Sequence, residues 1–425
     1  MSARPHIPST LGPGLIVVPT LPGYRFVIAG LIALLAFSGG LSFFATGPIT
    51  PIIIDHYAVS HSAVGLLTGL GALIHVVLAI PVSTLVGRVG LKKLVTFGAL
   101  ALSAPVLSFA ATDSFALLLM TRAIFSLGFL VMFPASDPLF MQWFKPRELP
   151  VVNGLFIVSF SLGIATSTFV VAPLADVIGW ETALSVFGGF SLVAALFWVA
   201  LGRAGTVERS REPHATRDRV VSVMRSRVAL LLAMADASAV TVLTVSLAWL
   251  PTYFSDVHGI SLSKAGMLMG LMSVAGVFAL VLASLLSLRV ASRRPLIIIP
   301  GVVIGFAAFG TFLLADTPAV YLAVIALGLA TWFYMPALMT LPMELYADDP
   351  ARVSVIFAFL VGTSGVAMFV SPVTVGALFD ITGSFVPGLA LFAIVSWGLA
   401  IAGFLLPEAG PSKPDALEPL AVTLR

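Results

Sequence analysis

Long apolar segments dominate this chain, and their length predicts helices that cross a lipid bilayer. A helix rises about 1.5 Å per residue, so about 20 apolar residues cross a hydrocarbon core roughly 30 Å thick. Backbone exposed to lipid must satisfy its own hydrogen bonds, which favours α-helix. Twelve spans are predicted, at residues 25–47, 62–86, 92–110, 115–137, 149–173, 182–202, 227–253, 262–287, 296–315, 318–343, 353–378 and 385–406. We therefore expect an all-α membrane protein with twelve transmembrane helices.

The chain also repeats itself at an interval of about half its length. The pattern Arg-Val-x-x-basic-basic at 88–93 returns at 289–294, an offset of 201. Further pairs keep nearly the same register: Asp55 with Asp256, Ser62 with Ser263, Pro134 with Pro336, and Asp176 with Asp380. Matches spread over both halves indicate a duplication. We expect two six-helix bundles related by pseudo-two-fold symmetry about an axis along the membrane normal, an arrangement typical of transporters.

Composition excludes a soluble globular protein. Hydrophobic residues make up 59% of the chain, charged residues only 10%, and the mean hydropathy is +1.10. Soluble domains carry about 25% charged residues. The chain has no cysteine, so it holds no disulfide, no thiolate metal site and no redox motif. The net charge of +3 comes from basic residues spread over short loops, and we expect no nucleic-acid partner.

The distribution of Lys and Arg predicts the orientation in the membrane. With the N-terminus inside, Lys264 alone falls on the outer side and Arg122 falls within a span, which leaves the other 20 of 22 basic residues in cytoplasmic segments. The positive-inside rule then places both termini in the cytoplasm of a plasma (bacterial inner) membrane protein. The loops after spans two and eight are predicted to gate the cytoplasmic face through Arg88, Lys92, Lys93, Arg289, Arg293 and Arg294.

Five segments follow from this topology. Residues 1–24 lack the features of a cleaved signal peptide and are expected to form a cytoplasmic tail. Residues 25–202 and 227–406 are the expected bundles, 203–226 the polar cytoplasmic linker, and 407–425 a second cytoplasmic tail.

Two six-helix halves, a basic central linker and a basic loop between spans two and three resemble the major facilitator superfamily. The loop at 83–92 is similar to the family motif in its Arg, second Gly and Lys, but Ser83 replaces the first Gly and Gly87 replaces an Asp. Arg122 and the small residues after it resemble a span-four motif, and 143–148 resembles the loop after that span. The Gly-Pro pair of drug antiporters is absent from span five. Residues 248–253 and 336–345 are similar to the cyanate and nitroimidazole transporter group.

Charged and ionisable groups inside the predicted spans are the candidates for substrate binding or coupling, since a charge at the bilayer centre costs roughly 2.5–3.5 kcal/mol. Arg122 in span four has no equivalent in the second half; it can bind an anionic substrate, lower the pKa of a nearby carboxylate, or be a structural Arg bonded to carbonyls. Asp236 in span seven can carry a proton, or bond to a nearby hydroxyl or linker Arg. The resemblance implies that spans one, four, seven and ten line the cavity. His75 in span two can be a relay or gate, or bond across to span eleven.

Other polar and aromatic residues carry a weaker indication of function. Trp332 and Tyr334 in span ten can shape a substrate site, or simply pack. Glu344 and Arg352 are expected to pair with each other in the loop after that span. The acidic residues at outer span ends are expected to be helix-end and turn residues: Asp55, Asp176, Asp256 and Asp380.

The function predicted from the sequence is secondary active transport. There is no phosphate-binding loop, hydrolase elbow, zinc helix or haem motif, so we expect neither an enzyme nor a cofactor or metal site. The expected substrate is a small organic anion moved by alternating access, with protons as the coupling partner and the protein acting as a monomer. A neutral or weakly basic metabolite or drug is the alternative substrate. A non-transporting receptor or assembly factor on the same fold is the alternative of another class.

Overall fold

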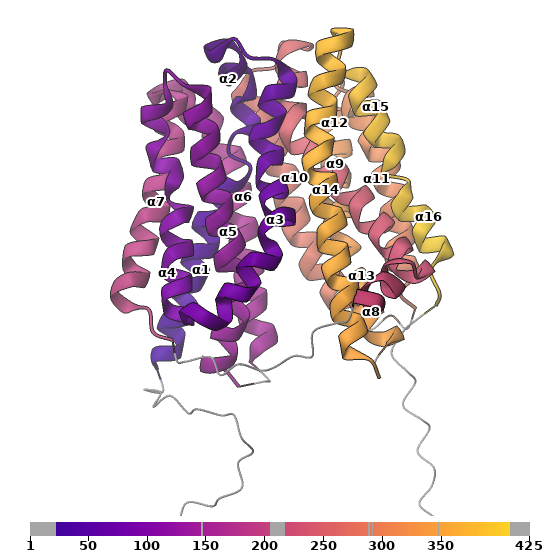
Figure 1. Ribbon diagram of the computed structural model, residues 1–425. Helices are drawn as coiled ribbons and strands as arrows, with labels where there is room; N and C mark the ends of the chain where they lie inside the picture. The colour runs from indigo at the N-terminus through magenta and orange to yellow at the C-terminus, as the bar shows by residue number, and fades with distance from the viewer. Residues whose placement is uncertain are drawn as a thin grey trace, which may run out of the picture.

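The computed structural model describes residues 23–145, 148–204, 217–287, 290, 292–346 and 348–408. Every regular element in these residues is helical, and twelve helical segments are long and apolar enough to cross a membrane. Figure 1 shows them as two bundles of roughly parallel helices standing side by side. The prediction of an all-α fold with twelve spans in two bundles is confirmed.

The first bundle contains α1 to α7. Its elements are α1 (Tyr24–Phe43), η1 (Gly47–Ile49), α2 (Thr50–Tyr57), α3 (His61–Val89), α4 (Leu91–Leu102), η2 (Ala104–Ala111), α5 (Phe115–Trp143), α6 (Leu149–Ile178) and α7 (Trp180–Leu201). We call the face at which α1 begins the terminal face, because the described chain starts and ends there; it is at the bottom of Figure 1. The opposite face, which carries α2, is called the distal face.

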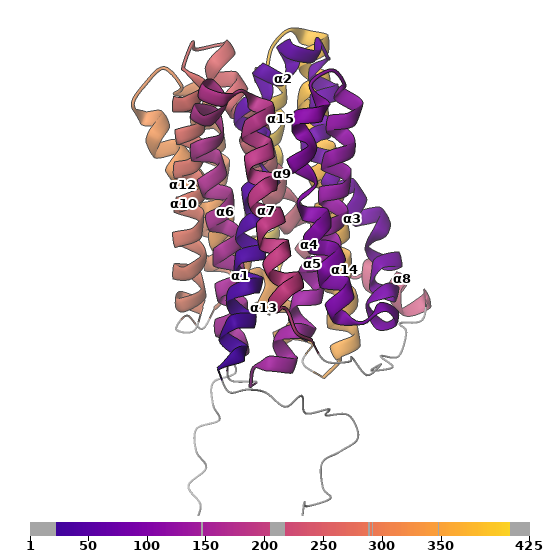
Figure 2. The ribbon, with the colours of Figure 1, turned by 90° about the vertical axis from the view of Figure 1, so that its left-hand side faces the viewer.

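The second bundle contains α9 to α16. Its elements are α9 (Arg227–Asp256), α10 (Leu262–Ser287), α11 (Pro295–Leu313), α12 (Ala319–Phe333), α13 (Met335–Leu345), α14 (Pro350–Thr382), α15 (Val386–Val395) and α16 (Gly398–Leu405). The predicted linker ends in a short helix that the sequence did not indicate, α8 (Arg217–Met224), which lies at the terminal end in Figure 2. Residues 205–216 of that linker lie outside the described residues.

Four spans predicted as continuous helices are interrupted. The third span changes from α4 to η2 at Ser103, just before Pro105. The first span changes from α1 to η1 just before Pro48, and the tenth changes from α12 to α13 at Tyr334, just before Pro336. The twelfth changes from α15 to α16 around Trp397. Proline has no N–H to donate and its ring crowds the preceding turn, which explains the breaks before Pro48, Pro105 and Pro336. Each break frees backbone carbonyls inside the protein.

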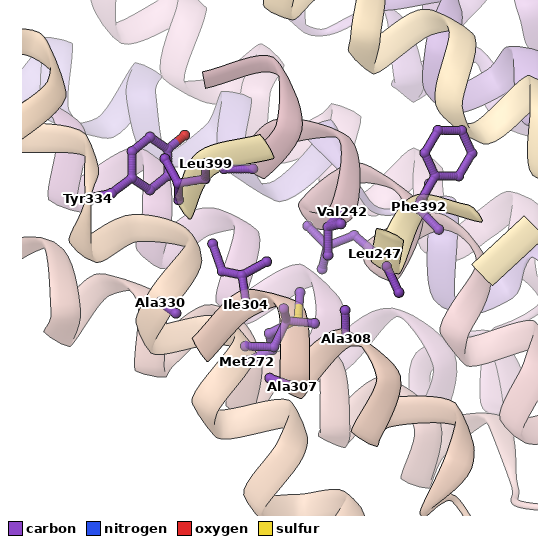
Figure 3. Packing of buried hydrophobic residues seen from close by; sticks show 14 of the residues in the cluster. Val242, Leu247, Met272, Ile304, Ala307, Ala308, Ala330, Tyr334, Phe392 and Leu399 are labelled. Atoms are coloured by element: carbon purple, nitrogen blue, oxygen red, sulfur yellow. The ribbon is translucent and has the colours of Figure 1, made fainter. Parts of the chain in front are cut away.

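A large apolar core holds the second bundle together. Figure 3 shows part of it, with Val242 of α9, Ile304 of α11 and Phe392 of α15 packed in one cluster. Val242 and Ile304 are essentially inaccessible to solvent, and the cluster extends through α10, α12 and α14. Such close packing allows a bundle to move as one body.

The two bundles are joined at the distal face by two hydrogen-bonded contacts at related positions of the repeat. Asp380, near the end of α14, accepts the backbone N–H groups of His61 and Ser62 at the start of α3, both at 3.0 Å. Asp176, near the end of α6, accepts the hydroxyl of Ser263 at the start of α10 at 2.9 Å. We call these two contacts the distal latches. The carboxylates are at helix ends, as predicted, but each one binds a helix of the other bundle.

Candidate functional site

Asp236 is the buried carboxylate around which the candidate coupling site is built. It lies on α9 with 6% of its surface exposed, and hydroxyl groups from two other helical segments donate to it. The Tyr334 hydroxyl donates to Oδ1 at 2.9 Å, and the Ser364 hydroxyl donates to Oδ2. Burying a carboxylate is costly unless its oxygens are hydrogen-bonded. The two donors meet part of that cost and connect α9 to the α12–α13 break and to α14.

Tyr334 reaches Asp236 because the tenth span is broken there. Tyr334 lies between α12 and α13, with 2% of its surface exposed. Trp332, two residues earlier, is half-buried and its ring lies against Gly276 of α10, where a Cβ would collide with it. The structure thus brings two of the predicted residues together, Asp236 and Tyr334, and places Trp332 against a different helix.

Arg122 is buried in α5 and binds the end of α1. Its two terminal nitrogens donate to the carbonyls of Ser42, at 2.6 Å, and Phe43, at 2.8 Å. These are the last carbonyls of α1, which have no partner within that helix because the helix ends at Phe43. The guanidinium also lies 5.2 Å from the centre of the Phe125 ring. In this conformation Arg122 therefore has the carbonyl partners of the structural alternative.

The charge of Arg122 is nevertheless not neutralised nearby. Within the described parts of the chain, no carboxylate forms an ion pair with it. Its Nε is buried and has no hydrogen-bond partner among those residues. A buried guanidinium that retains a free donor and its full charge can accept an anionic group of a ligand.

His75 lies in the middle of α3 and bonds within its own helix. Its Nδ1 lies 2.7 Å from the Gly71 carbonyl, so that nitrogen carries the hydrogen, and Nε2 is buried without a partner in the described residues. The ring contacts Phe129 of α5, with 5.3 Å between ring centres. The predicted bond across to span eleven is not present, although the neighbouring residue Val76 does approach α14 at Gly365.

The basic residues predicted to gate the cytoplasmic loops differ in their surroundings. Arg289 and the side chain of Arg88 lie outside what the structure describes, while Lys92 and Lys93 are exposed. Arg293 is 6% exposed and forms an ion pair with Glu344 at 2.6 Å, and Arg294 donates to the Leu406 carbonyl at 2.8 Å through Nε. Both arginines therefore tie the start of α11 to neighbouring segments of their own bundle.

The predicted pairing of Glu344 with Arg352 is wrong. Glu344 binds Arg293 instead, while Arg352 donates to the Tyr346 hydroxyl and lies 3.9 Å from the centre of that ring. The α10–α11 connection brings Arg293 beside α13, and its guanidinium reaches the Ser287 carbonyl as well. Glu344 is thus paired with an arginine that is distant in the sequence, Arg293, and not with the nearby Arg352.

In the first bundle, Glu148 forms an ion pair at the terminal face that is comparable to the Glu344–Arg293 pair of the second bundle. It lies 2.8 Å from Arg25 and also accepts the backbone N–H of Lys145 at 3.0 Å. The Lys145 N–H and, to a smaller degree, the Arg25 guanidinium hold the pKa of Glu148 below its usual value. This ion pair ties the start of α1 to the loop between α5 and α6.

Ser364 is the member of the site that the sequence did not single out. Serines are common in transmembrane helices, where the hydroxyl usually bonds a carbonyl of its own helix. The register of α14 directs Ser364 toward Asp236, and hydropathy does not report that direction. The repeat offers a partial signal, because the offset of 204 that relates Asp176 to Asp380 pairs Ser364 with Phe160. The second half thus has a serine hydroxyl where the first half has the aromatic ring of Phe160.

Comparisons with known proteins agree with this architecture. The Major Facilitator Superfamily profile matches residues 32–372. A probable sulfoacetate transporter of Cupriavidus necator is 23% identical over 413 residues, which cover 92% of this chain and 96% of that protein. A hexuronate transporter of Bacillus subtilis is 22% identical over 336 residues, 72% of this chain and 77% of that protein. An uncharacterized transporter of the same bacterium, YycB, is 25% identical over 385 residues, 89% of this chain and 93% of that protein.

Solved structures show the same fold. A bacterial homologue of the human lysosomal transporter Spinster, inward-facing and unoccupied, superposes with a TM-score of 0.69 at 17% identity, covering 90% of this chain and 94% of that one. The nucleoside transporter NupG superposes with a TM-score of 0.74 at 12% identity, covering 89% and 99%. The chain belongs to the Major Facilitator Superfamily and is a multi-pass membrane transporter of a small molecule, not an enzyme.

Proposed function

We propose that this protein is a secondary active transporter that moves a small organic anion by alternating access, driven by protons. The observation that carries the substrate class is Arg122, a buried guanidinium whose partners among the described residues are carbonyls and an aromatic ring, with no such partner for Nε. Carbonyl acceptors stabilise the cation without cancelling its charge, so an entering carboxylate or sulfonate gains a strong electrostatic partner. The relatives named for sulfoacetate and hexuronate transport are consistent with an anionic substrate.

Proton coupling is assigned to Asp236. A buried carboxylate with two hydroxyl partners can take up a proton when one face of the protein is open and release it when the other face is open. The hydroxyls of Tyr334 and Ser364 are suited to this role, because each can donate to the anion or accept from the acid. Trp332 and His75 are proposed to line the path beside these two charged groups.

The orientation proposed from the basic residues makes the terminal face cytoplasmic. The distal latches then close the path toward the outside. Each bundle supplies one of the two charged groups, Arg122 from the first and Asp236 from the second, so one chain suffices for a complete path. We accordingly propose a monomeric unit in the inner membrane, with the narrower similarity to cyanate and nitroimidazole transporters kept as a prediction.

The test is transport by purified protein in liposomes. Uptake of labelled sulfoacetate, a hexuronate and a set of monocarboxylates is measured with and without an imposed inward proton gradient, beside neutral and weakly basic compounds of similar size. We expect accumulation of anions that increases with the gradient. Accumulation of neutral or basic compounds alone would contradict the anion assignment. Saturable binding with no flux of any compound would favour the receptor alternative.

The Asp236→Asn variant separates transport from its driving force. The amide cannot exchange a proton, so we expect loss of gradient-driven accumulation while counterflow exchange of the substrate continues. Thr363→Ala, a hydroxyl change on the neighbouring helix, serves as the matched control and is expected to accumulate substrate normally. If the Asn variant still concentrates substrate in response to the gradient, Asp236 is not the coupling site.

A further inference from the structure

Ser364 links the candidate coupling carboxylate to the contact between the two bundles. It lies on α14, which packs along α3 of the other bundle. The next residue, Gly365, is at the point of contact: a Cβ placed there would lie 2.6 Å from Cγ2 of Val76 and 3.6 Å from the Ala72 carbonyl, both on α3. The hydroxyl that donates to Asp236 is therefore one residue away from a close contact with the first bundle.

The direction of this hydroxyl distinguishes it from its neighbour on the same helix. Thr363 donates to the carbonyls of Phe359 and Leu360, at 3.0 and 2.9 Å, within α14 itself. That local bond is the usual arrangement for a hydroxyl in a membrane helix. Ser364 instead bonds across to α9, so any shift of α14 against α9 lengthens or shortens a bond to the carboxylate.

Such a bond responds to the protonation state of the carboxyl group. The anion accepts from both Ser364 and Tyr334, whereas the neutral acid has one O–H that must donate, so one of the two hydroxyls has to become an acceptor. By linkage, a bond that depends on both the proton and the position of α14 makes each of them depend on the other.

We propose that Ser364 is a positioning residue that makes the proton affinity of Asp236 depend on how α14 packs against α3, and hence on the relative position of the two bundles. The proposal rests on the proton coupling at Asp236 proposed above. The proposal adds that a movement of one bundle against the other changes the Ser364–Asp236 hydrogen bond, and through it the proton affinity of Asp236.

Few other ionisable groups of the described residues face this site. Tyr334 is in direct contact with Asp236, and His75 on α3 bonds to the Gly71 carbonyl of its own helix. The remaining ionisable side chains on α9 and on the helices packed against it are near helix ends: Arg227, Tyr253 and Asp256 on α9, Lys264 on α10, Tyr321 on α12, Glu344 on α13, Arg352 and Asp380 on α14, His61 on α3, and Asp55, His56 and Tyr57 on α2.

The test measures the pH dependence of the conformation, which requires no identified substrate. The chain has no cysteine, so spin labels attach only at introduced sites. Leu201→Cys and Leu405→Cys place one label at the terminal end of each bundle, on exposed positions outside the site. Distances between the labels in lipid nanodiscs are followed from acid to alkaline pH, and the midpoint of the change is recorded.

Ser364→Ala is expected to move this midpoint to higher pH by about one unit, because the anion loses one of its two donors. Gly365→Ala is expected to move the midpoint as well, since the added methyl collides with Val76 and alters the packing of α14 against α3 without touching the hydroxyl or the carboxyl group. The Gly365→Ala variant also tests the proposal if the Ser364→Ala protein does not fold. Asp236→Asn is expected to remove the pH-dependent change.

Two neighbours on α14 provide matched controls. Thr363→Ala removes a hydroxyl that bonds only within the helix, and Gly362→Ala adds a methyl where nothing lies within 4 Å. Both are expected to keep the midpoint of the unmodified protein. Thermal unfolding and elution volume establish that each variant is folded.

The outcomes separate this inference from the proposed function. If the unmodified protein responds to pH and Asp236→Asn does not, but Ser364→Ala and Gly365→Ala keep the original midpoint, the positioning role of Ser364 is refuted and proton coupling at Asp236 stands. If the unmodified protein does not respond, or Asp236→Asn responds fully, the coupling role of Asp236 is refuted and the inference falls with it.

Discussion

The distal latches allow the balance between conformations to be predicted from two carboxylates. Asp380 binds two backbone N–H groups of α3 through its two oxygens, and the His61 ring lies 3.2 Å from the same carboxylate. Replacing Asp380 by Asn removes the negative charge at the positive end of α3 and leaves one acceptor oxygen for two donors. Alternating access requires this contact to break when the distal face opens.

The size of the effect follows from the partial exposure of the contact. Hydrogen bonds to a charged group contribute about 1.5–3 kcal/mol, and a charge at a helix end contributes about 0.3–1 kcal/mol. The Asp380 side chain is 26% exposed, so water screens part of the interaction. We therefore expect Asp380→Asn to weaken the contact by about 1–2 kcal/mol, which lowers the ratio of closed to open distal faces about 5- to 30-fold. Asp176→Asn, which affects a single hydroxyl bond, is expected to have the smaller effect.

Spin labels at Ala116→Cys and Ala319→Cys report the distal distance, because both residues are exposed at the distal ends of their bundles. Asp380→Asn should increase the population with the longer distance, and the double variant with Asp176→Asn should increase it further. Asp113→Asn removes an exposed carboxylate of the same face and is the control. An unchanged distance distribution in a folded double variant would refute the reasoning.

Three further predictions concern the charged groups of the site and of the terminal face. Arg122→Lys keeps the charge but not the two-pronged geometry, so anion uptake should fall markedly; full uptake by Arg122→Ala would rule out a substrate role. Glu344→Gln leaves the buried Arg293 without its carboxylate, which should lower the thermal unfolding temperature, whereas an equal loss in an Arg352→Ala protein would argue against this pairing. Glu148 has a lowered pKa, so its contribution to stability is present above the usual value of 4.5 and is lost as the pH falls through the lowered pKa; the stability difference from Glu148→Gln should disappear in that acid range, as followed by unfolding at several pH values.

Hydropathy predicts the spans well, because a helix in lipid must be long and apolar whatever it packs against. It does not predict where a span breaks. Pro48 and Pro336 each indicate a possible break, but Pro134, Pro138, Pro173 and other prolines lie inside helices that continue. Whether a proline ends a helix depends on what its neighbours offer to the freed carbonyls, and that is a property of the packed structure.

Side-chain partners are predictable only as far as the helix that supplies them is known. The sequence identified Asp236 and Tyr334 separately, yet their contact depends on the register between α9 and the α12–α13 break. It expected Arg122 to bind either a ligand or carbonyls, and only the structure shows that those carbonyls are the last ones of α1. Polar residues in spans can therefore be identified from sequence as candidates, while their partners require the fold.

The duplication separates the positions that hold the bundles together from those that carry chemistry. The distal latches are kept in both halves, Asp176 with Ser263 and Asp380 with Ser62, because closing one face of a two-fold scaffold places the same demand on each bundle. The charged groups within the membrane are not kept. At the offset of 202 that relates Pro134 to Pro336, Arg122 corresponds to Val324, and at the offset of 201 Asp236 corresponds to Leu35. A buried charge costs several kcal/mol unless something compensates it, so a charge present in one half and absent from the other is not required by the scaffold. The first bundle holds the cation and the second holds the carboxylate with its hydroxyls, so a substrate between them meets two different surfaces. A gate repeated in both bundles and a site that differs between them suit the proposed transport of an anion coupled to protons.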